Sequence, residues 1–208
     1  DLLMSDVDYN QIYQVVKPYI SYNDFMVDAG CGSGYFLIEL LQNEHQAIGI
    51  DMDSSMLAIA LEKLTSLGLP AKLYEHDLRN PLGAKADVIF MMFDVINYFK
   101  GAKRILRNMH TGLNTKGRLI FDVYKEEVLE NYHDFMEINN EPFDYQWEIK
   151  TDKHVMMHTL TIQDEKEMVR QYVYPLPYYL NILKDLGFTY DVKEGPDIRK
   201  HYIIAYKK

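Results

Sequence analysis

The feature that most constrains this chain is a glycine-rich segment between two apolar stretches. Residues 25–34 read FMVDAGCGSG, and residues 46–51 read QAIGID. A buried strand, a tight turn, a helix and a second strand that ends in an acid predict one unit of a parallel α/β sheet. Gly30, Gly32 and Gly34 allow the backbone to turn sharply, and they let a ligand approach where a Cβ would collide.

The alternation of short apolar runs with amphipathic stretches continues along the chain and predicts a doubly wound α/β domain. Strands joined by helices pair in parallel, with right-handed crossovers. After residue 124 the period changes to two, which predicts an antiparallel meander. The expected helices are 8–20, 35–42, a helix capped by Asp53 or Ser54 and closed by Gly68, 95–113, a piece at 126–133, and 177–186; the expected strands are 25–30, 46–51, 71–76, 87–93, 118–123, the meander strands 143–150, 154–162 and 167–174, and the final pair 188–193 and 201–206.

The spacing of the glycines separates two classes of nucleotide site. A dinucleotide-binding turn follows G-x-G-x-x-G, and its third glycine would stand at position 35, where this chain has Tyr35. The turn therefore disfavours NAD and FAD. Asp28 and Asp51 end two separate strands, where they can meet a ligand's ammonium group and its sugar hydroxyls. A tight strand-to-helix turn without a ligand is the alternative interpretation.

The pattern Asp28-x-Gly30-x-Gly32-x-Gly34 resembles the first motif of class I S-adenosylmethionine-dependent methyltransferases. Residues 1–9, DLLMSDVDY, together with the late meander, are similar to the YqeM-like group of small bacterial methyltransferases. This resemblance implies a Rossmann-like seven-stranded sheet of order 3-2-1-4-5-7-6 with strand 7 antiparallel. It also implies a single domain over 1–208, inserted strands at 136–175 that cover the acceptor pocket, and S-adenosylmethionine as cofactor.

The resemblance also implies roles for residues around the cofactor. Asp51 would hold both ribose hydroxyls, Met52 would cover one face of the adenine, and Asp77 would accept a hydrogen bond from the adenine amino group. Core packing of Met52 and a turn-forming role of Asp77 are the alternatives. The expected cofactor contacts are Asp28, Gly30, Cys31, Gly32, Ser33, Gly34, Asp51, Met52, His76, Asp77, Leu78 and Phe93.

The acceptor side is less explicit. Residues 91–98, MMFDVINY, end the fourth strand, and ligands of open α/β sheets lie beyond the carboxyl ends of strands. This segment lacks the Asn-Pro-Pro-Tyr or Asp-Pro-Pro-Tyr turn, which weakens a nucleic-acid amino-methyltransferase interpretation. Methyl transfer demands alignment above all, and a general base only when the acceptor arrives protonated. No catalytic residue can be chosen; the candidates are Asp94, Asn97, Tyr98, His158, Arg170 and Tyr172.

Several of these candidates could have purely structural roles instead. Asp94 could cap the helix that follows it, His158 could be a satisfied core histidine, and Arg170 could be a solvated residue on a covering strand. His154 and His158 share one strand face about 13 Å apart, too far to bind one ion, so no metal site is expected. Cys31 is the single cysteine, which excludes an intrachain disulfide and suits a reducing cytoplasm. We expect it to be a small side chain that fits the turn, with a reactive thiol as the alternative.

Composition limits the class of protein and its partners. The 208 residues suit one domain, and no apolar run approaches the roughly 18 residues of a membrane span. The start shows no secretory signal, so we expect a cytoplasmic protein. A net charge of −9 argues against tracking along a nucleic-acid duplex. A basic stripe is read as a solvated helix face or, alternatively, a nucleic-acid footprint; it consists of Lys100, Lys103, Arg104 and Arg107.

Three functions are consistent with these patterns. The first is transfer of a methyl group to a small-molecule nitrogen or oxygen acceptor. The second is a tRNA or protein methyltransferase, for which the basic stripe would have to join the rim of the pocket. The third is a cofactor-binding fold that serves interaction without catalysis. The sequence is consistent with either a monomer or a dimer.

Overall fold

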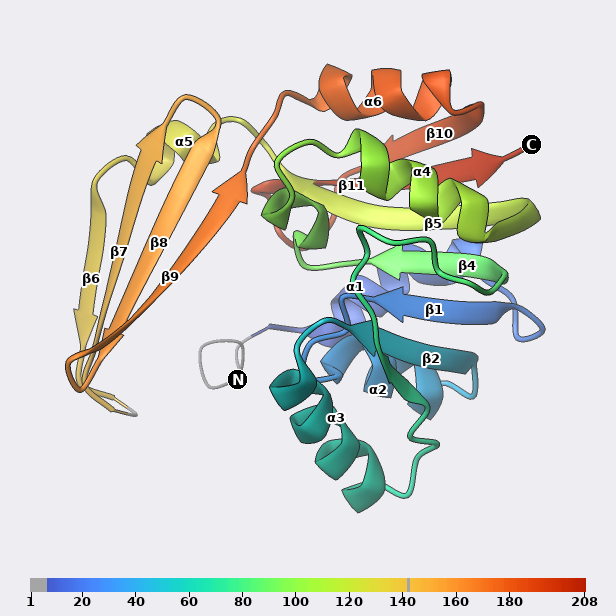
Figure 1. Ribbon diagram of the computed structural model, residues 1–208, viewed down its shortest axis with the longest axis horizontal. Coiled ribbons are helices and arrows are strands. Elements are labelled where there is room, and N and C mark those ends of the chain that lie inside the picture. Colours follow the sequence, from blue (N-terminus) through green and yellow to red (C-terminus); the bar gives the residue numbers. More distant parts are fainter. Residues whose placement is uncertain (1–6, 142) are drawn as a thin grey trace.

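A seven-stranded sheet forms the centre of the molecule in the computed structural model, which describes residues 7–141 and 143–208. Its order is β10-β11-β5-β4-β1-β2-β3, which is the predicted order 3-2-1-4-5-7-6 (Figure 1). β11 pairs antiparallel with both β10 and β5, as expected for the seventh strand. The strands are β1 (Phe25–Ala29), β2 (Gln46–Asp51), β3 (Leu73–Glu75), β4 (Ala86–Met91), β5 (Leu113–Tyr124), β10 (Phe188–Lys193) and β11 (Lys200–Lys207).

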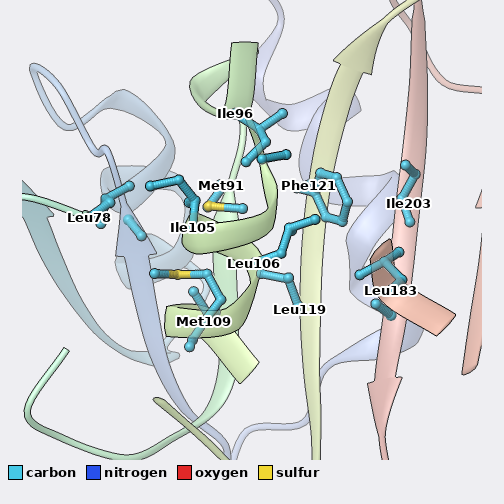
Figure 2. Packing of buried hydrophobic residues seen from close by; sticks show 14 of the residues in the cluster. Leu78, Met91, Ile96, Ile105, Leu106, Met109, Leu119, Phe121, Leu183 and Ile203 are labelled. Atoms are coloured by element: carbon cyan, nitrogen blue, oxygen red, sulfur yellow. The ribbon is translucent and has the colours of Figure 1, made fainter. Parts of the chain in front are cut away.

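Helices cover both faces of this sheet, so the doubly wound fold is confirmed. Ile105, Leu106 and Met109 of α4 pack on Met91 and Phe121 of the central strands (Figure 2). A second apolar cluster lies under α1 and α2 on the other face. Strands covered on both faces are apolar throughout, as in parallel sheets generally. The helices are α1 (Tyr9–Val16), η2 (Lys17–Tyr19), α2 (Tyr35–Gln42), α3 (Ser54–Ser66), η3 (Val95–Tyr98), α4 (Lys103–Gly112), α5 (Val128–Asn131) and α6 (Leu176–Asp185).

The predicted meander is a second, four-stranded antiparallel sheet of order β6-β7-β8-β9. It consists of β6 (Phe135–Asn139), β7 (Tyr145–Asp152), β8 (Val155–Ile162) and β9 (Glu165–Tyr172). Figure 1 shows it beside the edge where β1 and β4 end. The pattern missed β6, because Met136 and Ile138 are exposed on this edge strand and only Phe135 packs inward.

Other differences have local causes. The expected helix 95–113 is two helices, because Gly101 takes a φ of +103° between η3 and α4. The fourth strand ends at Met91, since Phe93 and Asp94 both adopt positive φ. The leading helix ends at Val16 and continues as a 3₁₀ turn that contains Pro18. None of the described helices is long and apolar enough to cross a membrane.

Candidate active site

The glycine turn is tied to the end of the second strand. The amides of Gly30 and Cys31 donate to the carbonyl oxygen of Ile50 at 2.8 and 3.0 Å. Gly30 and Gly32 have φ values of +81° and +51°, which disfavour other residues. A Cβ on Gly30 would lie 2.7 Å from Val95, whereas a Cβ on Gly32 would meet open space. The turn therefore packs closely on one side and leaves the other side open for a ligand.

Asp51 connects this turn to the loop that precedes α3. Its Oδ2 accepts from the Gly32 amide at 2.8 Å, and its Oδ1 accepts from the Asp53 amide at 2.9 Å. Each carboxylate oxygen can accept a further hydrogen bond. Met52 is 57% exposed, so its interpretation as core packing is wrong. Asp53 caps α3 as predicted, accepting from the amides of Ser55 and Met56.

Asp28 is a buried carboxyl group with an unused acceptor. Only 3% of the residue is exposed, and its Oδ2 has no hydrogen-bond partner among the described residues. Burial, reinforced by the charge of Asp51, raises the pKa of Asp28 to about 7. A buried acceptor of this kind is costly unless a donor reaches it. A cationic or hydrogen-bonding ligand would supply that donor.

These groups line one cavity of about 560 Å³, within the range of roughly 300–1,000 Å³ that is usual for small-molecule sites. Among the expected cofactor contacts, all but Gly34 and Asp77 line it. Sequence reasoning missed most of its apolar and aromatic wall, since lone tyrosines and methionines in helices read as core. The further lining residues are Tyr9, Tyr35, Phe36, Asp53, Met56, Arg79, Met92, Val95, Tyr98 and Phe99.

Asp77 is engaged outside this lining. Its carboxylate accepts from the backbone amide and the Nε of Arg79, and the Arg79 Nη2 lies 2.7 Å from its Oδ2. Hydrogen bonds from Arg79 lower the pKa of Asp77. The Asn80 amide also donates to the Asp77 carbonyl oxygen, so Asp77 forms the turn before Pro81. Its contact with adenine stays a prediction, and Arg79 lines the cavity in its place.

Three further predicted cofactor contacts are Cys31, His76 and Gly34. The Cys31 thiol is a free cysteine in the cavity wall, and burial raises its pKa, so it stays protonated. This agrees with a small side chain that fits the turn. His76 lies with its Nε2 3.3 Å from the carbonyl oxygen of Asn80, and it also lines the cavity. Gly34, with φ of +83°, precedes α2 without reaching the cavity.

Asp94 is part of a buried ion cluster and does not cap η3 with its side chain, so the capping interpretation is wrong. Its Oδ1 lies 2.5 Å from the Nζ of Lys200, which lies 3.2 Å from the Oδ2 of Asp122. Burial opposes the charge of Lys200, but both carboxylates outweigh it and raise the pKa of Lys200 well above its usual value. Sequence reasoning missed Lys200 and Asp122.

Asn97 and Tyr172 meet each other rather than the cavity. The Asn97 side chain is fully buried and donates to the Tyr172 carbonyl oxygen at 2.8 Å and to the Tyr179 hydroxyl at 3.3 Å. Tyr98, from the same short helix, lines the cavity with half of its surface exposed there. Desolvation by the surrounding walls raises the pKa of Tyr98, so its phenol stays protonated. Of the six acceptor-side candidates, Tyr98 alone lines the cavity.

The other two candidates on the second sheet, His158 and Arg170, also lie outside the lining. His158 receives a hydrogen bond from Trp147 at 3.2 Å, and its Nε2 lies 3.0 Å from the Gln171 Oε1, as expected of a satisfied histidine. Arg170 is exposed on the opposite face of β9 from Gln171. His154 contacts the carbonyl oxygen of Val173 instead. Within residues 7–141 and 143–208, no three metal-ligating side chains form a cluster that could hold an ion.

Comparison with known proteins agrees with this geometry. Residues 26–117 match the family model described as a methyltransferase domain. This segment is similar to methyltransferase domains. It spans the glycine turn, the second, third and fourth strands, and the first part of β5. The recognition of a class I S-adenosylmethionine-dependent methyltransferase is thereby confirmed, together with the enzyme class and the cofactor class.

Curated relatives extend the similarity beyond this domain. The chain is 24% identical over 205 residues to the putative methyltransferase YqeM of Bacillus subtilis (strain 168), which covers 90% of this chain and 83% of that protein. It is 27% identical over 181 residues to the carboxy-S-adenosyl-L-methionine synthase of Campylobacter jejuni subsp. jejuni serotype O:23/36 (strain 81-176). That match covers 81% of this chain and 71% of that protein.

Solved structures share the whole fold, including the second sheet. An S-adenosylmethionine-dependent methyltransferase from Clostridium acetobutylicum ATCC 824 superposes with a TM-score of 0.84 at 21% identity, over 99% of this chain and 94% of that one. The sugar N-methyltransferase KedS8 from Streptoalloteichus sp ATCC 53650 gives a TM-score of 0.82 at 17% identity, over 100% and 91% of the two chains. These likenesses establish the common fold.

Proposed function

We propose that this protein transfers the methyl group of S-adenosylmethionine to a small-molecule nitrogen or oxygen acceptor. The observation that carries the proposal is the cavity between the glycine turn and the fourth-strand loop. One of its walls holds a buried acceptor to which no described residue donates, at Asp28, and a carboxylate with spare acceptor sites, at Asp51. A ligand that combines an ammonium group with vicinal hydroxyls satisfies both.

The residues of the cavity fit this cofactor. Asp51 would accept from the ribose hydroxyls, and Asp28 would meet the ammonium group. Met52 and Leu78 supply apolar surface on which the adenine would lie. When bound, the cofactor supplies a methyl group activated by its sulfonium. The open side of Gly32 leaves room for the ligand next to the turn.

On the acceptor side, the described geometry favours positioning over proton removal. Asp94 is ion-paired with Lys200, His158 uses Nδ1 to accept from Trp147, and the raised pKa of Tyr98 keeps its phenol protonated. None of these is a free base. An acceptor that arrives as a neutral amine needs only alignment, which can supply most of the rate. The sugar N-methyltransferase among the structural neighbours supports an amine acceptor. We place the acceptor beside Tyr98, under the second sheet.

The alternatives have less support. The basic stripe, Lys100, Lys103, Arg104 and Arg107, is exposed, but none of its residues lines the cavity. A tRNA substrate would need them at the rim. The free thiol of Cys31 supports a reducing, cytoplasmic setting. Similarity to a carboxy-S-adenosyl-L-methionine synthase favours one second candidate, in which the cofactor itself is modified.

Two measurements test the proposal. Calorimetric titration with S-adenosylhomocysteine and, separately, NADH should show binding of the first alone; binding of NADH alone, or of neither, would refute the cofactor assignment. Incubation with methyl-labelled S-adenosylmethionine and a panel of amino sugars, other amines, phenols, tRNA and protein should label a small molecule. A parallel incubation with a carboxyl-group donor tests the second candidate, because mass spectrometry of the adenosine product distinguishes S-adenosylhomocysteine from a carboxylated cofactor.

A further inference from the structure

A chain of side-chain hydrogen bonds joins the second sheet to the fourth-strand loop. The Trp147 indole of β7 contacts His158 of β8, His158 contacts Gln171 of β9, and the Gln171 amide contacts Asp94. Gln171 is 4% exposed and Asp94 is 8% exposed, so water competes little for the bond between them. The chain crosses from the sheet shown in yellow and orange in Figure 1 to the catalytic edge of the main sheet.

The chemistry of the groups gives the chain one direction. An indole N–H can only donate, so the His158 Nδ1 accepts and the proton of the neutral ring lies on Nε2. The Nε2–H then donates to the Gln171 Oε1, which leaves the Gln171 amide nitrogen to donate to the Asp94 Oδ2. Every donor meets an acceptor, and the chain ends on the carboxylate paired with Lys200.

A second contact lies one residue further along β9. The Asn97 amide of η3 donates to the Tyr172 carbonyl oxygen at 2.8 Å. Residues 171 and 172 therefore both bind the segment 94–98, one through its side chain and one through its backbone. This segment includes Tyr98 of the cavity wall.

We propose that Gln171 is a positioning residue that holds the second sheet against segment 94–98 and thereby sets the acceptor side of the cavity. Gln171 does not line the cavity itself; it acts through Asp94 and through a hydrogen bond with the Tyr98 side chain, which does line it. Its effect on catalysis rests on the proposed function. The hydrogen-bond chain itself does not, so it can be tested without any substrate.

Trp147 makes the chain observable, since it is the single tryptophan of the protein. It also stacks on the His158 ring, with centroids 5.8 Å apart and planes 20° apart. Protonation of Nδ1 would remove the acceptor of the indole N–H and change the tryptophan emission. Burial lowers the pKa of His158, and Gln171 and Asp94, which face it from β9 and the fourth-strand loop, oppose this effect.

The first experiment follows tryptophan emission of the full chain from pH 4.5 to 8.5. In Gln171→Leu the protonated ring loses the acceptor of its Nε2–H, a contact that raises the pKa of His158, so the emission midpoint should fall by about half a pH unit or more. Gln146→Leu, on the opposite face of β7, should keep the midpoint of the parent protein. An unchanged midpoint in Gln171→Leu would overturn the proposal.

The second experiment measures hydrogen exchange of Gln171→Leu, with Gln146→Leu as the matched control. Gln171→Leu should speed exchange at least tenfold in segment 94–98 and in β9, and leave the first two strands unchanged. Parent-like exchange in segment 94–98 would contradict the proposal. The affinity for S-adenosylhomocysteine should stay within about twofold in this variant. If the parent protein itself fails to bind S-adenosylhomocysteine, the proposed function fails while the chain still stands or falls on these two readouts.

Discussion

The ammonium group of Lys200 lies 2.5 Å from the Oδ1 of Asp94, a residue 106 positions earlier in the chain. The pair brings together the first residue of β11 and the loop after β4. It exists because β11 runs antiparallel to β5, which places the beginning of β11 at the edge where the parallel strands end. Asp122 shares the same ammonium from β5 and also accepts from the Asp94 amide at 2.6 Å.

Replacing Lys200 should strongly destabilise the fold. Lys200→Met removes the cation between two buried carboxylates, and breaking a buried ion pair on one side typically costs about 3–5 kcal/mol. Urea denaturation should show a loss of this order in the free energy of unfolding. The exposed Lys193→Met should change it by less than about 0.5 kcal/mol. Adding Asp122→Asn to Lys200→Met should restore part of the loss, and no restoration would show that charge is not the cause.

Asp51 should dominate the affinity for the cofactor product. Hydrogen bonds to a charged group are worth about 1.5–3 kcal/mol each, so Asp51→Ala should weaken S-adenosylhomocysteine binding roughly 100-fold or more. Asp51→Asn keeps one acceptor oxygen and should lose about tenfold. Glu75→Ala makes the same charge change at the exposed end of the next strand and should bind as the parent does. Calorimetry measures all three, and equal affinities for Asp51→Ala and Glu75→Ala would refute the ribose assignment.

Asp28 should make stability fall as pH rises. Its pKa is about 7 in the folded protein, against about 3.8 in the unfolded chain, so the folded state binds more protons between these values. Stability is therefore lost from about pH 4 to pH 7, and the loss is complete above pH 7. The unfolding free energy of Asp28→Asn, minus that of the parent, should grow by roughly 2–4 kcal/mol between pH 4.5 and 7.5. A constant difference would contradict the buried, uncompensated carboxyl group.

The same group should couple ligand binding to pH. Ionised Asp28 attracts the ligand's ammonium group, so the affinity for S-adenosylhomocysteine should rise as pH increases from 6 to 8. Asp28→Asn should flatten this rise. Calorimetric titrations at three pH values would measure it, with proton release determined from buffers of different ionisation enthalpy. A parent protein whose affinity falls with pH would exclude the ammonium role.

Substitution of Gly30 should mainly lower stability, whereas substitution of Gly32 should mainly lower ligand affinity. Gly30→Ala places a Cβ against the Val95 side chain, so it should lower the melting temperature by several degrees. At Gly32 a Cβ meets no protein atom within 4 Å but would occupy the ligand's side of the turn. Gly32→Ala should therefore reduce the affinity for S-adenosylhomocysteine at least tenfold. Its cost in stability should be smaller, about 1 kcal/mol, because it arises only from the positive φ. The reverse ranking would show that the open side of the turn is not where the ligand lies.

The central sheet could be predicted because each of its strands carries its own local signal. The strands 46–51 and 188–193 and the helix 35–42 are bounded by turn residues and have a clear period, and the structure has the same bounds. The strand order came from the resemblance, since periodicity alone does not order strands. β6 could not be predicted, because an edge strand with one inward side chain lacks a clear alternation.

The cofactor wall was accessible for the same reason, whereas the acceptor side was not. Gly30, Asp28 and Asp51 lie within one βαβ unit, and their spacing in the sequence identifies them. Lys200 stands between Arg199 and His201, and in sequence it reads as a surface charge. Only its position at the start of a buried strand hints otherwise. Gln171 gives no signal at all, because its partners lie on β8 and in segment 94–98 and are defined by the packing of the two sheets.

The late position of Lys200 also sets an order of events during protein synthesis. Asp94 and Asp122 precede it by 106 and 78 residues, and ribosomes add about 5–20 residues per second. For several seconds the nascent chain thus contains both carboxylates, while Lys200, the cation that pairs with them, has not yet been synthesised. The loop beside the cofactor can settle only after β11 has emerged, so the methyltransferase site should mature as one of the last parts of the domain.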